Sequence, residues 1–197
     1  MLSNKAAGLT VVMATIFVLL SACASGQTEP VVDTPVPQNQ TGVAELDAII
    51  AAALGGDLEK LRSFLGFTQT TCTFAEGLGG PPRCLDSEQE GTPVEVLPFL
   101  GPEGHFVRND DIESWEGVDV SEVFAVYQVS ERAYSEANYP AGEYAIVFVS
   151  SPENQTSVTL QVQEGRIVRI DYGFGYPPAI REDDVVKYLV SPVNTKP

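Results

Sequence analysis

The amino-acid sequence predicts an α+β domain in which a pair of helices precedes a mostly antiparallel sheet of four to five strands, and a short helix ends the chain. Three observations predict this class. Apolar residues recur at three- and four-residue steps early in the domain, later segments are rich in β-branched and aromatic residues, and a helical pattern returns near the C-terminus. This order is typical of α+β folds rather than of alternating βαβ units.

The helix pair is predicted from one apolar face in each of two neighbouring segments. The first face consists of Leu46, Ile49, Ile50, Ala53 and Leu54. Gly55-Gly56 ends this helix, and Asp57 is a favourable N-cap for the second. The face of the second helix, which Gly66 follows, consists of Leu58, Leu61, Phe64 and Leu65.

The sheet is predicted from five segments, which span residues 94–100, 123–129, 144–149, 158–162 and 167–172. Glu164-Gly165 between the last two favours a tight hairpin. In that hairpin Val158, Leu160 and Val162 share one face, whereas Thr159, Gln161 and Gln163 share the other. We therefore expect one buried and one solvated side of the sheet. Residues 183–190 are predicted to form the C-terminal helix, which ends near Pro192.

Two cysteines lie between the helices and the sheet. Cys72 and Cys84 flank a segment rich in glycine and proline, and we expect them to form a disulfide in an exported chain. A loop of this size should stabilise the fold by roughly 3 kcal/mol in the chain-entropy model. A redox switch or a metal pair are the alternatives, but the spacing is far wider than Cys-x-x-Cys and only His105 is left to assist a metal.

The N-terminal segment has the three regions of a secretory signal peptide. Lys5 lies in a short polar start, residues 9–20 form an uncharged apolar run, and small residues follow. Leu20-Ser21-Ala22-Cys23 resembles the bacterial lipobox. The resemblance implies cleavage before Cys23 and a diacylglycerol on its sulfur. A plain signal peptide and an uncleaved helical anchor are the alternatives.

We therefore divide the chain into a signal peptide (residues 1–22), a lipid-anchored flexible tether (23–42) and one globular domain (43–197). The expected location is the cell membrane or the outer membrane, on the extracytoplasmic face. The formal net charge is −16, and removing residues 1–22 with Lys5 makes it one unit more negative. Such a surface should repel nucleic acid, so we expect no nucleic-acid partner.

Few residues suggest catalysis or metal binding. His105 is the only histidine, and no Gly-x-Ser-x-Gly motif supplies a nucleophile, so we interpret His105 as a loop or strand-start residue. Acidic residues gather around Trp115 between Asp110 and Asp119. Their spacing differs from a calcium loop and equally fits a helix start with a solvated face; calcium binding stays open. We predict no cofactor, no metal site and no catalytic residue.

The most unusual segment of the domain alternates aromatic residues with glycine. Tyr172, Phe174 and Tyr176 should share one side of an extended strand, and we name them, together with Trp115, as candidate binding residues. If that side is open, it offers an aromatic platform for a ligand. We favour the alternative that Tyr172 and Phe174 belong to the core, with Tyr176 at its rim.

The helix pair with Gly56-Asp57, the sheet and the Glu164-Gly165-Arg166-Ile167 hairpin resemble the NTF2-like (cystatin-like) architecture. That resemblance implies a cone-shaped fold that encloses a pocket, and it carries over no functional residue. We interpret the chain as a membrane-anchored, non-enzymatic binding module whose partners are the membrane, through Cys23, and a small-molecule, glycan or protein ligand. Two alternatives stay open: a small hydrolase or isomerase using carboxylate and tyrosine residues in a pocket, and a structural envelope lipoprotein.

Overall fold

The computed structural model describes residues 40–75, 77, 80–151, 153 and 155–192 of the 197-residue chain. The predicted signal peptide, Cys23 and nearly all of the tether lie outside these residues, so the interpretations placed on them stay predictions. No helix in the described part of the chain is long and apolar enough to cross a membrane.

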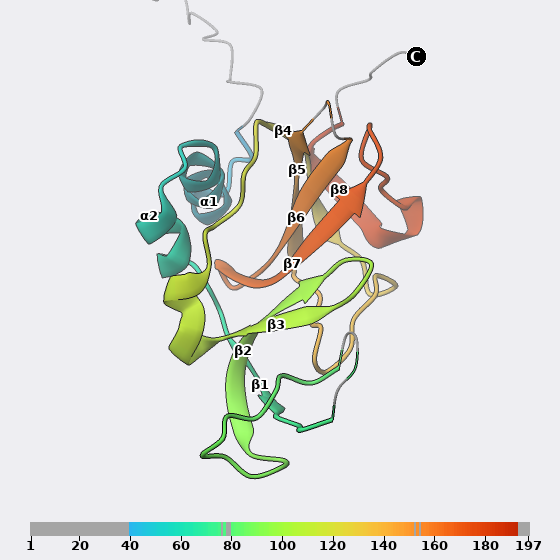
Figure 1. The fold of residues 1–197 in the computed structure, drawn as a ribbon. Coiled ribbons are helices and arrows are strands. Elements are labelled where there is room, and N and C mark those ends of the chain that lie inside the picture. Colours follow the sequence, from blue (N-terminus) through green and yellow to red (C-terminus); the bar gives the residue numbers. More distant parts are fainter. Residues whose placement is uncertain (1–39, 76, 78–79, 152, 154, 193–197) are drawn as a thin grey trace, which may run out of the picture. The chain divides into compact units, whose positions relative to one another are not determined.

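Both predicted N-terminal helices are present, and both are short. Helix α1 spans Ala44–Leu54, and α2 spans Leu58–Ser63. Asp57 is the N-cap of α2, where its carboxylate accepts a hydrogen bond from the backbone N–H of Lys60 at 3.0 Å. The side chain of Asp47 in α1 accepts bonds from Thr41, which ties the entering chain to the helix. Figure 1 shows α1 and α2 together on one side of the strands.

The rest of the domain is one eight-stranded mixed sheet. The strand order is β1-β2-β7-β6-β5-β4-β8, with β3 paired to β2. All pairs are antiparallel except β2 and β7, which run parallel with Phe99 opposite Ile170. The strands are β1 (Thr68–Thr71), β2 (Pro93–Leu100), β3 (His105–Arg108), β4 (Glu122–Val129), β5 (Tyr144–Ser151), β6 (Thr156–Gln163), β7 (Arg166–Phe174) and β8 (Val185–Val190).

The predicted fold class is therefore wrong. The sheet has eight strands instead of four to five, it is mixed, and it makes up far more of the domain than the helices do. The predicted C-terminal helix is instead the short 3₁₀ helix Glu182–Asp184 followed by β8. Residues 185–190 are mainly β-branched and aromatic, and they pair with the edge of β4, where Tyr127 lies opposite Tyr188.

The two faces of the sheet differ. On one face, here called the helix side, Val158, Leu160 and Ile170 are buried beneath α1 and α2. On the opposite face, here called the loop side, a smaller apolar cluster of β4 and β5 contains Ala125, Tyr127, Ala145 and Val147. Because side chains alternate across a strand, the loop side of β6 and β7 carries polar residues beside this cluster.

The hairpin of β6 and β7 is confirmed. Glu164 and Gly165 both have positive φ, 50° and 71°, as a two-residue type I′ turn requires. The expectation that the second side is solvated is wrong, because Ser157 and Gln161 on the loop side are each only 6% exposed. Residues 130–143 and 175–184 pack near this face, and the partly buried Ile180 joins its apolar cluster.

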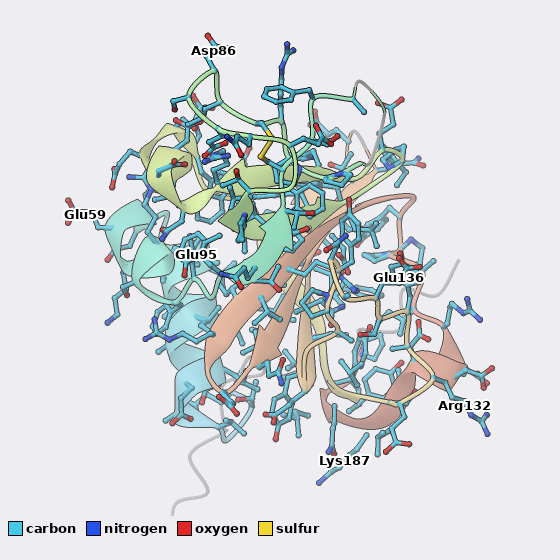
Figure 2. All side chains as sticks on the ribbon, turned by 90° about the horizontal axis from the view of Figure 1, so that it is seen from below. Glu59, Asp86, Glu95, Arg132, Glu136 and Lys187 are labelled. Atoms are coloured by element: carbon cyan, nitrogen blue, oxygen red, sulfur yellow. A yellow bond between two sulfur atoms is a disulfide. The ribbon has the colours of Figure 1, made fainter. Side chains whose placement is uncertain are left out.

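The predicted disulfide is confirmed. Cys72 and Cys84 are bonded, and both are buried beside Val94 and Val96 of β2. Figure 2 shows the sulfur–sulfur bond within the long connection that carries Asp86, whose side chain projects outward. The disulfide thus fixes the connection between β1 and β2 to the sheet.

Candidate functional site

The candidate site is a cavity of about 270 Å³ on the loop side, here called the sheet cavity. Its floor is formed by neighbouring strands and its wall by the connections around residues 133–134 and 178–184. Concave sites with a few convergent polar groups are the usual places for ligands. The polar residues around this one include Tyr127, Tyr134, Ser157, Thr159, Gln161, Arg169, Asp171 and Asp184.

A buried ion pair forms one part of the floor. Arg169 and Asp171 are two residues apart on β7, so both side chains point to the loop side. Nε of Arg169 donates to Oδ1 of Asp171 at 2.7 Å, and Nη2 donates to Oδ2 at 3.0 Å. Gln161 of β6 donates from Nε2 to the same Oδ2 at 3.2 Å. The carboxylate is therefore held by three donors.

The same arginine anchors the covering segment. Nη1 of Arg169 donates to the carbonyl oxygens of Tyr134 and Tyr139, at 3.1 and 2.9 Å. Its guanidinium carbon lies 5.7 Å from the centre of the Tyr134 ring. Gln161 completes the clamp, because its Oε1 accepts from the backbone N–H of Gly142 at 3.1 Å. Arg169 is only 3% exposed, so its charge is satisfied within the protein.

Burial raises the pKa of two groups in the cavity, and neighbouring charges modify the two shifts differently. Burial raises the pKa of the Asp171 carboxyl, and the hydrogen bonds and charge of Arg169 act against this shift. Burial also raises the pKa of Tyr127 to about 12, and the negative charges of Asp184 and Asp171 contribute to that increase. The Tyr127 hydroxyl is therefore neutral at physiological pH, and it lies within the field of two carboxylates.

Several polar groups of the cavity are left without a protein partner. Among the described residues, the Tyr127 hydroxyl and the Asp184 carboxylate make no hydrogen bond or ion pair, although Tyr127 is only 7% exposed. The hydroxyls of Ser157 and Thr159 also have no partner in this part of the chain. Among the described residues, the fully buried side-chain atoms without a partner are Nε of Arg62 and Nε1 of Trp115, so the oxygens of the cavity are not sealed off and are available to a ligand or to water.

The backbone around Asp184 is fixed. The N–H of Ser130 donates to the carbonyl of Asp184 at 2.9 Å, and the N–H of Asp184 donates to the carbonyl of Arg181 at 3.0 Å. The Ser130 hydroxyl also donates to the carbonyl of Asp183. The start of β8 and the end of β4 are thus joined at the edge of the cavity, and this connection fixes the backbone from which the Asp184 side chain extends.

The predicted aromatic residues lie at the surface. Tyr172, Phe174 and Tyr176 are 38%, 68% and 37% exposed, so the expectation that Tyr172 and Phe174 belong to the core is wrong. Ile170 is the last fully buried residue of β7, and the strand continues beyond it. Tyr172 still stacks on Phe99 at 6.1 Å, and both Tyr172 and Phe174 contribute to the rim of the sheet cavity. Their role in binding stays a prediction.

Trp115 lies apart from the cavity. It is 7% exposed within the helix-side core, where its ring meets the edge of Phe99 at 6.4 Å. Nη2 of Arg62 donates to its carbonyl at 2.6 Å and so attaches this segment to α2. The structure therefore does not bring Trp115 together with the residues of the cavity.

His105 begins β3, which confirms its interpretation as a strand-start residue. Its ring stacks on Phe99 at 4.7 Å, and burial lowers its pKa. It is not among the residues that line the sheet cavity. No base from this histidine therefore lies beside Ser157 or Thr159.

The acidic run begins with a 3₁₀ helix, Asn109–Ser114, that has no buried residue. Asp110 accepts bonds from Arg108, and Glu113 accepts one from Arg62, so both carboxylates are used in ion pairs. Within the described ranges, the only close group of metal-ligating residue types is Cys72, Cys84 and Glu88. Its two sulfurs are joined in the disulfide, which removes them as thiolate ligands.

No protein-family model matches the chain, and no curated protein and no solved structure matches it. The lipobox and the NTF2-like resemblance therefore stay predictions. The function must be argued from the geometry of the site.

Sequence reasoning missed Arg169, Gln161, Tyr127 and Asp184. A signal was present for the first two, because polar residues alternate with apolar ones in both strands of the predicted hairpin, and Arg169 and Asp171 fall on the same face as Gln161. An arginine and an aspartate on a face next to a glutamine indicate a paired network rather than a solvated surface. Tyr127 and Asp184 are separated by most of the sheet in sequence, and no local pattern connects them.

Proposed function

We propose that this protein is a membrane-anchored extracytoplasmic lipoprotein that binds a small ligand in the sheet cavity and acts without catalysis. The observation that supports binding is the contrast within the cavity. Its floor is rigidly paired through Arg169, Asp171 and Gln161, whereas Tyr127 and Asp184 beside it have no partner among the described residues. A fixed frame that presents free polar groups is what a preorganised binding site requires.

The chemistry of the cavity supports binding more than nucleophilic catalysis. Ser157 and Thr159 supply hydroxyls, but a hydroxyl nucleophile needs an adjacent base to be activated. The chain has one histidine, and it stacks on Phe99 outside the cavity. Arg169 is used by Asp171 and by two backbone carbonyls, so it is not available to stabilise a developing negative charge.

The membrane attachment is supported by the sequence alone. The segment up to Cys23 has the pattern of a lipoprotein signal, and a diacylglyceryl group holds a protein stably because two acyl chains are buried together. A tether of residues 23–42 reaches at most about 60 Å when extended, from ~3.1 Å per residue. This distance lets the domain meet a ligand beyond the headgroup layer.

The binding proposal is tested by screening small polar compounds against the purified full chain in detergent. Sugars, amino acids, amines and carboxylic acids are added at millimolar concentration, and the thermal midpoint is measured. We expect at least one class to raise the midpoint of the wild type. Thr159→Trp, which fills the cavity from β6, should abolish the shift. Thr156→Trp on the same strand, which does not line the cavity, is the matched control. A screen without any shift contradicts the proposal.

A second candidate is a small hydrolase or isomerase that uses carboxylate and tyrosine residues. One observation favours it: burial raises the pKa of Asp171 in a cavity that also holds Tyr127. Turnover of a compound found in the screen would support this reading if Tyr127→Phe reduced the rate but left the binding shift intact. Binding without turnover favours the first proposal.

A further inference from the structure

The charges around the sheet cavity do not cancel. Arg169 and Asp171 neutralise one another in a two-bond ion pair. Asp184 has no cationic partner among the described residues, and the neighbouring pair of Arg132 and Asp183, at 3.8 Å, does not include it. The cavity therefore carries one uncompensated negative charge, and the whole chain has a formal charge of −16. Both the local and the overall field attract cations and repel anions.

The hydrogen-bonding capacity of the cavity residues also favours a cationic ligand. The guanidinium of Arg169 directs Nε and Nη2 to Asp171 and Nη1 to the carbonyls of Tyr134 and Tyr139. The Asp184 carboxylate only accepts, with two oxygens and about four lone pairs. The hydroxyls of Tyr127, Ser157 and Thr159 both donate and accept. Acceptors thus exceed donors, so the complementary ligand is one that mainly donates.

The Tyr127 hydroxyl marks the position in the cavity at which a donor group of the ligand would bind. This side chain is 7% exposed, its ring packs edge-on against Tyr188 at 5.9 Å, and its hydroxyl has no partner within the described residues. The Tyr127 hydroxyl remains neutral at physiological pH. Its oxygen can therefore accept a hydrogen bond from a ligand, while its proton stays available to a different acceptor. The carboxylates of Asp184 and Asp171 contribute to its electrostatic environment. A ligand donor group near Asp184 would satisfy both the Asp184 carboxylate and the Tyr127 hydroxyl oxygen.

The volume of the sheet cavity limits the size of the ligand. The cavity volume of about 270 Å³ lies just below the range of roughly 300–1,000 Å³ that is typical for drug-sized ligands. Tyr172 and Phe174 border the cavity through β7, but alternation places their rings on the helix side, where Tyr172 stacks on Phe99. The loop side contributes the ring of Tyr127 to the lining, and aromatic rings attract cations and apolar carbon alike, which is compatible with an organic cation.

We propose that the sheet cavity binds a small organic cation through a primary ammonium group, which donates to the Asp184 carboxylate and to the Tyr127 hydroxyl oxygen. This inference rests on the proposed binding function and names its ligand class. Three donors on one ammonium fit an acceptor-rich site in which the only arginine is already paired.

The test uses pairs of probes that differ in one group. n-Butylamine is compared with n-butanol, cyclohexylamine with cyclohexanol, and glucosamine with glucose, with the full chain in detergent at pH 6 so that each amine is protonated. Ligand-observed NMR gives the dissociation constant of each probe. We expect at least one amine to bind about tenfold or more tightly than its hydroxyl counterpart, because a charge-assisted hydrogen bond is stronger than a neutral one. Raising the salt concentration should weaken that preference.

Two substitutions with matched controls locate the contact. Asp184→Asn should weaken amine binding about tenfold or more, whereas Asp183→Asn, which removes the adjacent exposed carboxylate, should leave it within about twofold. Tyr127→Phe should weaken amine binding with little change in the hydroxyl probe. Tyr188→Phe is its control, because Tyr188 packs against Tyr127 but does not line the cavity.

The outcomes separate this inference from the function on which it rests. If hydroxyl probes bind as tightly as the amines, the ammonium inference is overturned and the cavity remains a binding site. If Asp183→Asn and Asp184→Asn weaken amine binding equally, the effect comes from general surface charge, and the proposed contact is overturned. If no probe binds and the compound screen is also negative, both proposals fail.

Discussion

At the scale of single residues, the loop side of the sheet depends on one arginine. Arg169 connects a carboxylate of its own strand with two carbonyls of the covering segment. Buried ion pairs add little net stability compared with apolar replacements, but removal of one partner leaves a buried charge unsatisfied. The arrangement therefore fixes the position of the segment around residues 134–142 more than it adds to the total free energy of unfolding.

Arg169→Met should be strongly destabilising. The substitution leaves the Asp171 carboxylate and the carbonyls of Tyr134 and Tyr139 without their donor, and such losses cost about 3–5 kcal/mol. Urea unfolding measures the change. Arg132→Met is the control, because Arg132 is 80% exposed and its pair with Asp183 should contribute no more than about 1 kcal/mol. Similar effects of both substitutions would show that the network does not act as a clamp.

Phe174→Ala should change stability little. The side chain is 68% exposed at the end of β7, so we expect a loss below about 1 kcal/mol. Phe148→Ala in β5 provides the contrast, because a fully buried ring costs about 3–5 kcal/mol when it is removed. Chemical denaturation of both variants gives the comparison. A large loss for Phe174→Ala would mean that another segment covers this ring.

At the scale of elements, the sequence predicts the helices, caps and turns that are determined by neighbouring residues. Most of the apolar face of α1, the Asp57 cap and the tight turn at Gly165 were predictable, because each depends on neighbouring residues. Leu54 is exposed instead, and α2 ends at Ser63, before the predicted face residues Phe64 and Leu65. Strands β1 and β3 have four residues each, too few to establish a period. Residues 185–190 become a strand because the edge of β4 is available for pairing, which is information that a local pattern lacks.

Element contacts also explain why the candidate site was only partly predictable. The aromatic run was recognised from its composition, but its exposure depends on which other segments cover the end of β7, and local sequence does not contain that information. The sheet cavity needs residues of five strands, which the strand order brings together, and of two connections that pack on them. The disulfide was predictable because the domain holds two cysteines, which leave one pairing if the domain is exported as we propose.

The ion pairs that join β3 to the disulfide-bridged connection should make stability depend on pH. Arg108 donates to Glu88 at 2.7 and 3.1 Å and to Asp110 at 3.0 Å, and these bonds lower the pKa of both carboxyls. A lowered folded-state pKa adds stability above the unfolded value, which is 4.5 for Glu88, and that stability is lost as the pH falls through the folded value. Burial raises the pKa of Asp171, so its contribution has the opposite sign.

Glu88→Gln should therefore lower the thermal midpoint at about pH 7, and its effect should shrink as the pH falls below 4.5 and through the lowered folded-state pKa of Glu88, because the wild-type carboxyl then becomes protonated. The midpoint is measured for both proteins across this range. Glu59→Gln in α2 is the control, because Glu59 makes no ion pair among the described residues. A difference that stays constant with pH would mean that Glu88 acts through packing rather than through charge.

At the scale of the whole molecule, the domain presents most of its charged side chains to solvent, and Arg169 is the buried exception among the described residues. In Figure 2, Asp86, Arg132 and Lys187 project outward at the edges of the view, while the strands carry the two apolar clusters. With a formal charge of −16 on the whole chain, nearly all of it from the domain, the domain should be repelled by anionic headgroups. The proposed attachment through a lipid at the end of a tether would allow such an acidic domain to stay near a membrane without adsorbing to it.

Cys23→Ala tests the attachment directly. If Cys23 receives the diacylglycerol, the substitution should abolish lipid labelling and leave the signal segment uncleaved by the lipoprotein peptidase, because modification precedes cleavage. Membrane fractionation with a labelled fatty acid measures both effects. Cys72 and Cys84 are joined in the domain, so they offer no alternative thiol for the lipid, and Ser21→Ala, two residues before the cysteine, is the control that should retain the label. Undiminished labelling of Cys23→Ala would overturn the lipoprotein interpretation, and the acidic domain would then need another way to reach its ligand.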